Sequence, residues 1–166
     1  YDKASIISHA QAFTEGMKAA KVLTTAKHFP GLGAVTGNTD ISAGVRDDQT
    51  NSNSESVQIF KDLISSGTPS IMTATAIYDK IDPNLPGAFS SKMVDGLLRK
   101  QLSFDGLVIT DDLSNAVQVQ SWTPGQRAVL ALSAGNDLVL ANEPTQIPEM
   151  ISEVLQKAKA VNQPQE

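Results

Sequence analysis

The chain has 166 residues, of which 40% are hydrophobic, and a net charge of −5 from 13 basic and 18 acidic residues. This length fits one domain, and the apolar fraction suffices for a core, which argues against a disordered chain. No apolar run approaches the roughly 18 residues of a membrane-spanning helix, and no basic patch points to a nucleic-acid partner. With 0 Cys, the composition excludes disulfides, thiolate catalysis and Cys-ligated zinc.

The predicted elements alternate between helices and short strands. Apolar residues recur every three or four positions over residues 1–20, which predicts an amphipathic helix, and residues 22–26 form a β-prone run. Residues 31–54 are rich in Gly, Asn, Asp, Ser and Thr, which predicts a long surface loop. The later elements are a helix over 54–66, a strand over 70–74, a helix over 90–102, a strand over 106–110, a short helical stretch over 113–119, a helix over 124–134, a strand over 136–141 and a helix over 148–161.

Short, nearly continuous apolar strands, each followed by a helix, indicate the α/β class with a parallel sheet covered on both faces. Four βα units are visible in the sequence, whereas a (β/α)8 barrel has eight such units and about 250 residues. The count fits the second half of a (β/α)8 barrel, and periodicity leaves open a complete, doubly wound domain of four parallel strands. Tyr1-Asp2-Lys3 lacks both a Met and a signal-peptide pattern, so we expect the chain to be a fragment.

Polar side chains are predicted at the carboxyl ends of the strands, where parallel α/β folds place their sites. These positions hold Lys27 and His28, Thr73 and Thr75, Asp111 and Asp112, and finally Asn142 and Glu143. A cation, an imidazole and a carboxylate on successive strands would form a rim suited to a hydroxyl-rich ligand. The structural alternative is that Asp112 caps the next helix and that Asp111 pairs with Lys27.

Four blocks of the sequence occur in an order typical of one enzyme family. They are Lys27-His28-Phe29-Pro30-Gly31-Leu32-Gly33, then Ile71-Met72-Thr73-Ala74 with Asp82-Pro83, then Gly106-Leu107-Val108-Ile109-Thr110-Asp111-Asp112-Leu113-Ser114, and then Ala134-Gly135-Asn136-Asp137-Leu138-Val139-Leu140. Together they resemble family-3 glycoside hydrolases, in particular the bacterial β-N-acetylhexosaminidases. The resemblance covers nearly the whole chain and implies that residues 1–166 are a partial TIM-type barrel domain whose first half is absent.

The resemblance implies a retaining glycoside hydrolase that cleaves terminal β-linked N-acetylglucosamine. Asp111 would be the nucleophile that forms a covalent glycosyl-Asp intermediate. Lys27, His28, Met72 and Thr75 would bind the substrate. No cofactor and no metal are implied, because 2 His and 0 Cys give no ligand cluster of zinc spacing.

The proton donor is the point at which the sequence departs from the family pattern. The Asp-Ser-His triplet of the N-acetylhexosaminidases falls on Asn38-Thr39-Asp40, and neither His9 nor His28 lies on this loop. Asp40 is therefore the candidate acid/base, because a carboxylic acid is the ordinary proton donor of glycosidases. The alternative is that residues 38–40 form a turn without a catalytic role.

Two other functions fit the same residues. One is a β-glucosidase-like member of the family, and the other is a non-catalytic sugar-binding relative that has lost the Asp–His dyad. The expected partners are a β-linked carbohydrate and the missing N-terminal half of the barrel, in the same polypeptide or a companion chain, because half a barrel leaves strand edges unpaired. A Cys-free composition rich in Asn, Thr and Ser favours a secreted or cell-envelope protein over a cytoplasmic one.

Overall fold

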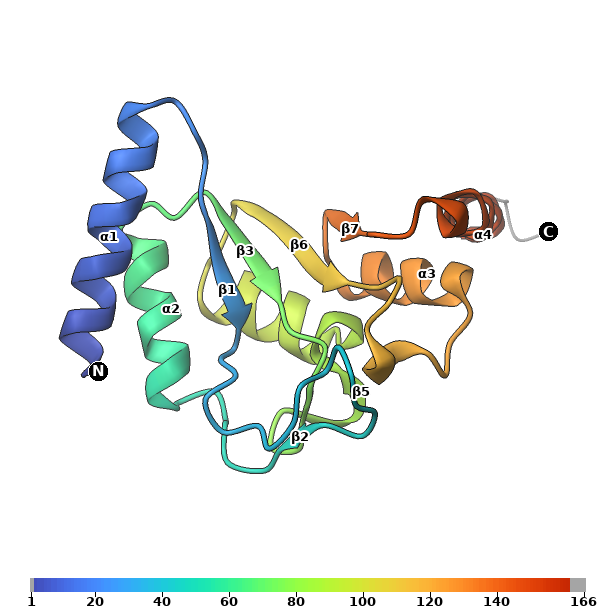
Figure 1. Cartoon of the computed structure of the whole chain (residues 1–166), viewed down its shortest axis with the longest axis horizontal. Coiled ribbons are helices and arrows are strands. Elements are labelled where there is room, and N and C mark those ends of the chain that lie inside the picture. Colours follow the sequence, from blue (N-terminus) through green and yellow to red (C-terminus); the bar gives the residue numbers. More distant parts are fainter. Residues whose placement is uncertain (1, 162–166) are drawn as a thin grey trace.

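A four-stranded parallel sheet lies at the centre of the computed structural model, which describes residues 2–161 (Figure 1). The strands run in the order β1-β3-β6-β7, with β1 at Thr25–Phe29, β3 at Ser70–Thr73, β6 at Leu107–Asp112 and β7 at Leu138–Leu140. The α/β prediction is thus confirmed. The order of the strands follows the chain without a reversal, as in successive βα units of a barrel, whereas a doubly wound sheet reverses at a switch point.

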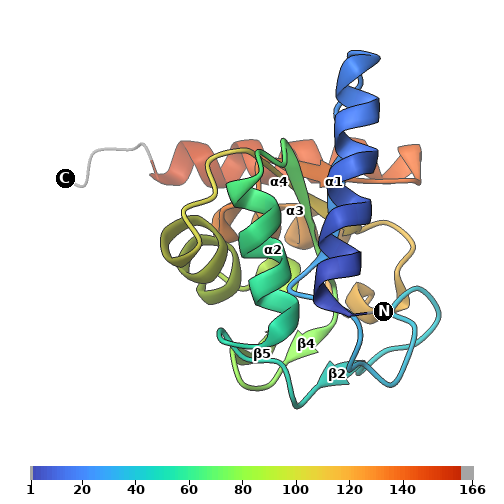
Figure 2. The ribbon, with the colours of Figure 1, turned by 90° about the vertical axis from the view of Figure 1, so that its left-hand side faces the viewer.

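Helices follow each of the four strands. The α-helices are α1 (Lys3–Ala19), α2 (Glu55–Ser65), α3 (Pro124–Ala134) and α4 (Ile147–Val161), η2 (Lys92–Gln101) is a π-helix, and η1 (Gly87–Phe89), η3 (Val117–Val119) and η4 (Pro144–Gln146) are short 3-10 turns. Figures 1 and 2 show α1 beside α2 at the β1 end of the sheet, and α3 packs against α4 at the β7 end. No helix within residues 2–161 has the length and apolar character needed to cross a bilayer.

Helix α3 has the bounds that the sequence predicts because its two ends are fixed by local chemistry. Thr123 and Gln126 form a reciprocal capping box at its start, and Pro124 occupies the first turn. Gly135 ends the helix with a φ of 111°, a conformation that disfavours side chains. These signals lie within a few residues of one another, so the sequence alone reveals them.

The core lies between the sheet and the helices on one of its faces. Ile71 and Val108 are fully buried there and belong to the same apolar cluster as Val57 and Leu98 of the surrounding helices. Alternate residues of the strands face the other way, where Leu107 is 42% exposed. The described part of the chain thus covers one face of the sheet with helices and leaves apolar side chains open on the other, contrary to the expectation of cover on both faces.

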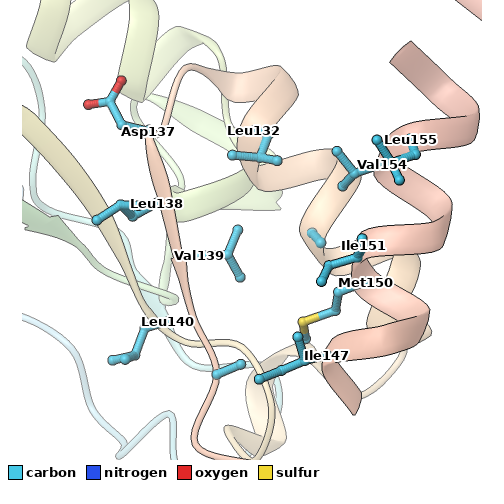
Figure 3. Close-up of a pocket in the computed structure, with 12 residues that line it drawn as sticks. Leu132, Asp137, Leu138, Val139, Leu140, Ile147, Met150, Ile151, Val154 and Leu155 are labelled. Atoms are coloured by element: carbon cyan, nitrogen blue, oxygen red, sulfur yellow. The ribbon is translucent and has the colours of Figure 1, made fainter. Parts of the chain in front are cut away.

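An apolar hollow of about 490 Å³ opens at the β7 edge, between β7, α3 and α4 (Figure 3). Val139 points into the space between the strand and the helices, while Leu138 and Leu140 point away to the other side of the strand. Ile151 and Leu155 of α4 line the hollow and are each 54% exposed. Apolar side chains therefore remain uncovered on both sides of this edge strand.

The first strand lies three residues later than its predicted position. The prediction rested on the β-prone side chains of residues 22–26, but Val22 and Leu23 are exposed. Strand β1 starts at Thr25, which pairs with Ser70 of β3, and ends with the fully buried Phe29. Pairing with β3 and burial of Phe29 determine the register, and Lys27 and His28 accordingly lie within the strand instead of after it.

A second, smaller sheet was not predicted. It joins β2 (Arg46–Asp47), which lies in the predicted loop 31–54, with β4 (Ile77–Tyr78) and β5 (Asp82–Pro86), which lie between the strand predicted over 70–74 and the helix predicted over 90–102. Strands β2 and β4 have two residues each, which is too short for a periodic pattern. Strand β5 contains Pro83 and Pro86, and Pro is typical of turns. The small sheet fixes part of the long loop 31–54 beneath the carboxyl ends of β1 and β3 (Figure 1).

Candidate active site

A hollow of about 420 Å³ lies at the carboxyl ends of β1 and β6. Its lining comprises Lys27, His28, Leu32, Val35, Gly37, Asn38, Thr39, Asp40 and Asp111. The hollow therefore brings together four of the six residues predicted for the site, from two strands and the long loop. Met72 and Thr75 do not belong to this lining.

Asp111 is held in place by the backbone on one oxygen and faces an imidazole with the other. Its Oδ1 accepts a hydrogen bond of 2.9 Å from the backbone N–H of Asp112. Its Oδ2 lies 3.5 Å from Nε2 of His28, and the two side chains are about one fifth exposed. The structural alternative predicted that Asp111 pairs with Lys27. Both Lys27 and His28 lie on β1, and the structure places the imidazole of His28 against Asp111.

The environment of His28 favours its neutral form. Burial of the imidazole lowers the pKa of His28 below its ordinary value, although the Asp111 carboxylate acts in the opposite direction. The charge of Lys27 lowers the pKa of His28 further, and that of Asp40 raises it. A neutral imidazole donates one hydrogen bond and accepts another, which suits contact with hydroxyl groups.

Asp112 shapes the turn after β6. The carboxylate accepts hydrogen bonds from the backbone N–H groups of Ser114 at 2.9 Å, Asn115 at 3.0 Å and Asn142 at 3.1 Å. Burial acts to raise the pKa of Asp112, but these hydrogen bonds outweigh it and the pKa is lowered. Asp112 therefore holds the turn after β6, whereas the predicted cap of the next helix is not observed, because η3 begins at Val117 and has no side-chain cap.

Asp40 lies on the rim of the hollow, in a turn. Its backbone N–H donates to Oδ1 of Asn38 at 2.8 Å, and the N–H of Ser42 donates to the Asn38 carbonyl at 3.0 Å. The intervening Thr39 is buried, whereas Asp40 is exposed. Residues 38–40 thus form a turn, as one alternative predicted, and the same turn presents Asp40 to the hollow.

The other two predicted binding residues are not among those that line the hollow. Met72 is half-buried in β3, where it pairs with Ile109 of β6. Thr75 is 1% exposed, and within residues 2–161 its Oγ1 has no hydrogen-bond partner. A role for Met72 and Thr75 in substrate binding stays a prediction.

Two residues that support the site carry no sequence motif. Arg127, only 3% exposed, donates from Nη1 to the carbonyls of Leu113 and Ser114, the residues that follow Asp112. Gln118 is 5% exposed and hydrogen-bonds the long loop. In the sequence, Arg127 stands out as a charged side chain among the apolar residues of the helix predicted over 124–134.

Within residues 2–161 no three His, Asp or Glu side chains gather closely enough to hold a metal ion.

Several known proteins are similar to this chain. The whole of residues 1–166 matches the family model described as "Glycosyl hydrolase family 3 N terminal domain". A "Beta-hexosaminidase" of Methylobacillus flagellatus is 35% identical over 153 residues, which are 91% of this chain and 44% of that protein. One of Hydrogenovibrio crunogenus is 36% identical over 147 residues, covering 87% of this chain and 41% of that protein.

A solved structure shares both sequence and fold. The crystal structure of a β-N-acetylhexosaminidase from Beutenbergia cavernae DSM 12333 superposes with a TM-score of 0.94 and is 51% identical, covering 96% of this chain and 48% of that one. The chain therefore spans less than half the length of these relatives. Its matching sequence, its strand order and its fold agree: the chain belongs to the family of glycosyl hydrolase family 3 N-terminal domains, and its four βα units are part of that barrel-type fold.

Proposed function

We propose that the protein is a retaining glycoside hydrolase that removes terminal β-linked N-acetylglucosamine, with Asp111 as the nucleophile and Asp40 as the acid/base. The observation that carries this proposal is the shared hollow, in which both carboxylates lie with Lys27 and His28. The relatives named β-hexosaminidase and β-N-acetylhexosaminidase support the choice of sugar.

The first step forms a covalent bond between enzyme and sugar. A carboxylate oxygen of Asp111 attacks the anomeric carbon while the bond from this carbon to the leaving oxygen breaks. Asp40, protonated at the start, donates its proton to the leaving oxygen, so the leaving group departs as an alcohol. The hydrogen bond from the Asp112 N–H fixes one oxygen of the nucleophile and orients the carboxylate for attack.

The second step releases the sugar. Asp40, now a carboxylate, takes a proton from a water molecule whose oxygen attacks the anomeric carbon from the side that the leaving group vacated. The ester bond to Asp111 breaks, and both carboxyl groups return to their starting state. Two inversions at the same carbon give overall retention of the β configuration. Lys27 and a neutral His28 would meanwhile hold the sugar hydroxyls through hydrogen bonds.

The test uses the natural polypeptide that contains this chain and aryl β-glycosides of N-acetylglucosamine and glucose. We expect hydrolysis of the N-acetylglucosaminide at a kcat/KM at least about tenfold above that of the glucoside, a discrimination of about 1.4 kcal/mol. Proton NMR of the first product should show the β anomer. Preference for the glucoside would favour the β-glucosidase-like alternative. Sugar binding without hydrolysis would favour the non-catalytic one, and an α product would contradict the retaining mechanism.

We further infer that a companion half completes the barrel around the open face of the sheet. Three observations support this: β1 and β7 are the outer strands, Leu107 and Leu138 remain 42% and 46% exposed, and the apolar hollow lies at the β7 edge (Figure 3). Unpaired N–H and C=O groups along such edges pair readily with another strand. The companion would supply a strand with aliphatic side chains, from the same polypeptide or another chain.

Sedimentation and thermal unfolding test the companion half. We expect residues 1–166 made alone to self-associate, or to unfold without a cooperative transition, since apolar area on the open face remains in water. The natural polypeptide, combined with the companion chain where the two halves are separate chains, serves as the control and should melt cooperatively. A monomeric, cooperatively melting segment of residues 1–166 would contradict the companion half.

A further inference from the structure

A buried glutamine joins the loop that carries Asp40 to the segment that follows Asp111. Gln118 lies in η3 and is 5% exposed. Its Oε1 accepts a hydrogen bond of 2.9 Å from the backbone N–H of Val45, and its Nε2 donates one of 3.1 Å to the Val45 carbonyl. The side-chain amide thus pairs with both backbone groups of a single loop residue, a two-point contact that fixes position and orientation together.

The backbone of η3 adds two more bonds to the same loop. The N–H of Val117 donates to the carbonyl of Asp40 at 3.2 Å, and the N–H of Gln118 donates to the carbonyl of Thr39 at 3.1 Å. The Val45 carbonyl also accepts a hydrogen bond of 3.1 Å from the N–H of Ile77 in β4. The loop is therefore held at Thr39 and Asp40 by backbone bonds and at Val45 by the Gln118 side chain.

After Asp40 the loop has few anchors until Val45. Between Thr39 and Val45 no residue is buried, and Ile41 is 75% exposed. Ordering irregular chain costs about 1–2 kcal/mol per residue in conformational entropy, so contacts outside the exposed stretch must stabilise it. Val45, 5% exposed and packed in the main apolar cluster, is the nearest anchor after Asp40, and Gln118 bonds to it directly.

The segment that carries Gln118 leads back along the chain to Asp111. Residues 113–118 continue directly from β6, and Arg127 holds the carbonyls of Leu113 and Ser114. Asp112 fixes the same turn through the Ser114 N–H. Because these contacts make the segment from Asp111 to Gln118 one packed unit, a displacement of the loop relative to this unit would change the position of one carboxylate relative to the other.

We propose that Gln118 is a positioning residue of the enzyme: it keeps Asp40 at the hollow that Asp111 lines. This inference rests on the proposed function, in which Asp40 protonates the leaving group. It predicts that loss of the Gln118 amide weakens proton transfer while leaving attack by Asp111 intact. The effect should therefore depend on how strongly the leaving group needs a proton.

The test compares two substrates of the natural polypeptide carrying Gln118→Met, which removes the hydrogen bonds and keeps an unbranched side chain. For an alkyl N-acetylglucosaminide, whose leaving group needs a proton, we expect kcat/KM to fall about 10- to 100-fold, as for a misplaced catalytic group. For the 2,4-dinitrophenyl glycoside, which leaves without a proton, we expect a change below about threefold, because kcat/KM reports only steps through bond cleavage.

Gln120→Met is the matched control. Nε2 of Gln120 donates to the carbonyls of Ser114 and Ala116 within its own segment, and neither acceptor belongs to the loop. This variant should leave kcat/KM for both substrates nearly unchanged. An equal fall for both substrates in Gln118→Met, or no fall for the alkyl substrate, would overturn the positioning role.

Hydrogen exchange gives a second test that requires neither activity nor a variant. It is measured on the unmodified natural polypeptide by mass spectrometry. We expect the amides that bond across the two segments, those of Val45, Val117 and Gln118, to open together with the same protection when exchange is resolved to single amides. Faster opening of the Val45 amide alone would overturn the inference even if the enzyme is active. Common protection in a protein without hydrolysis of any glycoside would instead contradict the proposed function and leave the connection between the two segments standing.

Discussion

Replacing Asp111 with Asn should reduce kcat for an aryl N-acetylglucosaminide by roughly 10⁴-fold or more, the scale seen when a nucleophile is removed from an enzyme that forms a covalent intermediate. An amide does not form the ester with the anomeric carbon, and the hydrogen bond from the Asp112 N–H persists because the amide oxygen still accepts it. Steady-state kinetics of the natural polypeptide measures the loss. Retention of more than a few per cent of the turnover would exclude Asp111 as the nucleophile.

Asp105→Asn is the matched control for this substitution. Asp105 is exposed and precedes the amino end of β6, whereas Asp111 lies at the carboxyl end of the same strand. The change in charge and size is identical, and kcat should stay within about twofold of the unmodified protein, as for most surface substitutions. A comparable loss in Asp105→Asn would show that the effect of Asp111→Asn is not specific to the hollow.

The titration of His28 shows whether Asp111→Asn leaves the site folded. The Asp111 carboxylate favours the imidazolium form and opposes the effect of burial, so its removal should lower the pKa of His28 further below its ordinary value. NMR titration of the imidazole protons, assigned with a His9→Gln variant, measures this shift. A His28 pKa that rises in Asp111→Asn would mean that the imidazole has moved into solvent.

Replacing Asp40 with Asn should lower kcat/KM for substrates with poor leaving groups by about 10²- to 10⁴-fold, the usual contribution of general acid catalysis. Dinitrophenyl glycosides should keep a kcat/KM close to that of the unmodified protein, because their leaving group needs no proton. In Asp40→Asn, azide should restore turnover of the dinitrophenyl glycoside, since azide attacks the glycosyl-enzyme without a general base and yields a β-glycosyl azide. The product is identified by NMR.

Asp48→Asn is the control for Asp40, because Asp48 is an exposed carboxylate further along the same loop. The neighbouring Asp47 is unsuitable, since it is fully buried and accepts hydrogen bonds from Thr50. Asp48→Asn should leave both substrates unaffected. An unchanged leaving-group dependence in Asp40→Asn would contradict its role and would indicate a proton donor elsewhere in the polypeptide.

Local signals explain why most elements of the fold are visible in the sequence. Helix α3 is delimited by Thr123, Pro124 and Gly135, all of which act within one turn of the helix ends. Strand β6 is a short apolar run, typical of a strand buried in a parallel sheet. The position of β1 and the two-residue strands β2 and β4 depend on pairing with distant residues, and periodicity does not report such pairing.

The same distinction applies to the site. Lys27, His28 and Asp111 could be predicted as neighbours because the carboxyl ends of parallel strands meet at one edge of the sheet. That His28, and not Lys27, faces Asp111 depends on side-chain direction within β1. The contact between Gln118 and Val45 joins residues far apart in the chain, and a buried Gln carries no motif that would mark it.

Trapping of the covalent intermediate tests the proposed nucleophile most directly. The natural polypeptide is incubated with activated fluoro-sugars of the N-acetylglucosamine and glucose series, which accumulate at the glycosyl-enzyme stage of a retaining enzyme. Peptide mass spectrometry then locates the label. We expect the N-acetylglucosamine reagent to label the peptide that contains Asp111, on Asp111 itself, and Asp111→Asn to remain unlabelled. A label on another carboxylate, or bound sugar without any label, would contradict Asp111 as the nucleophile.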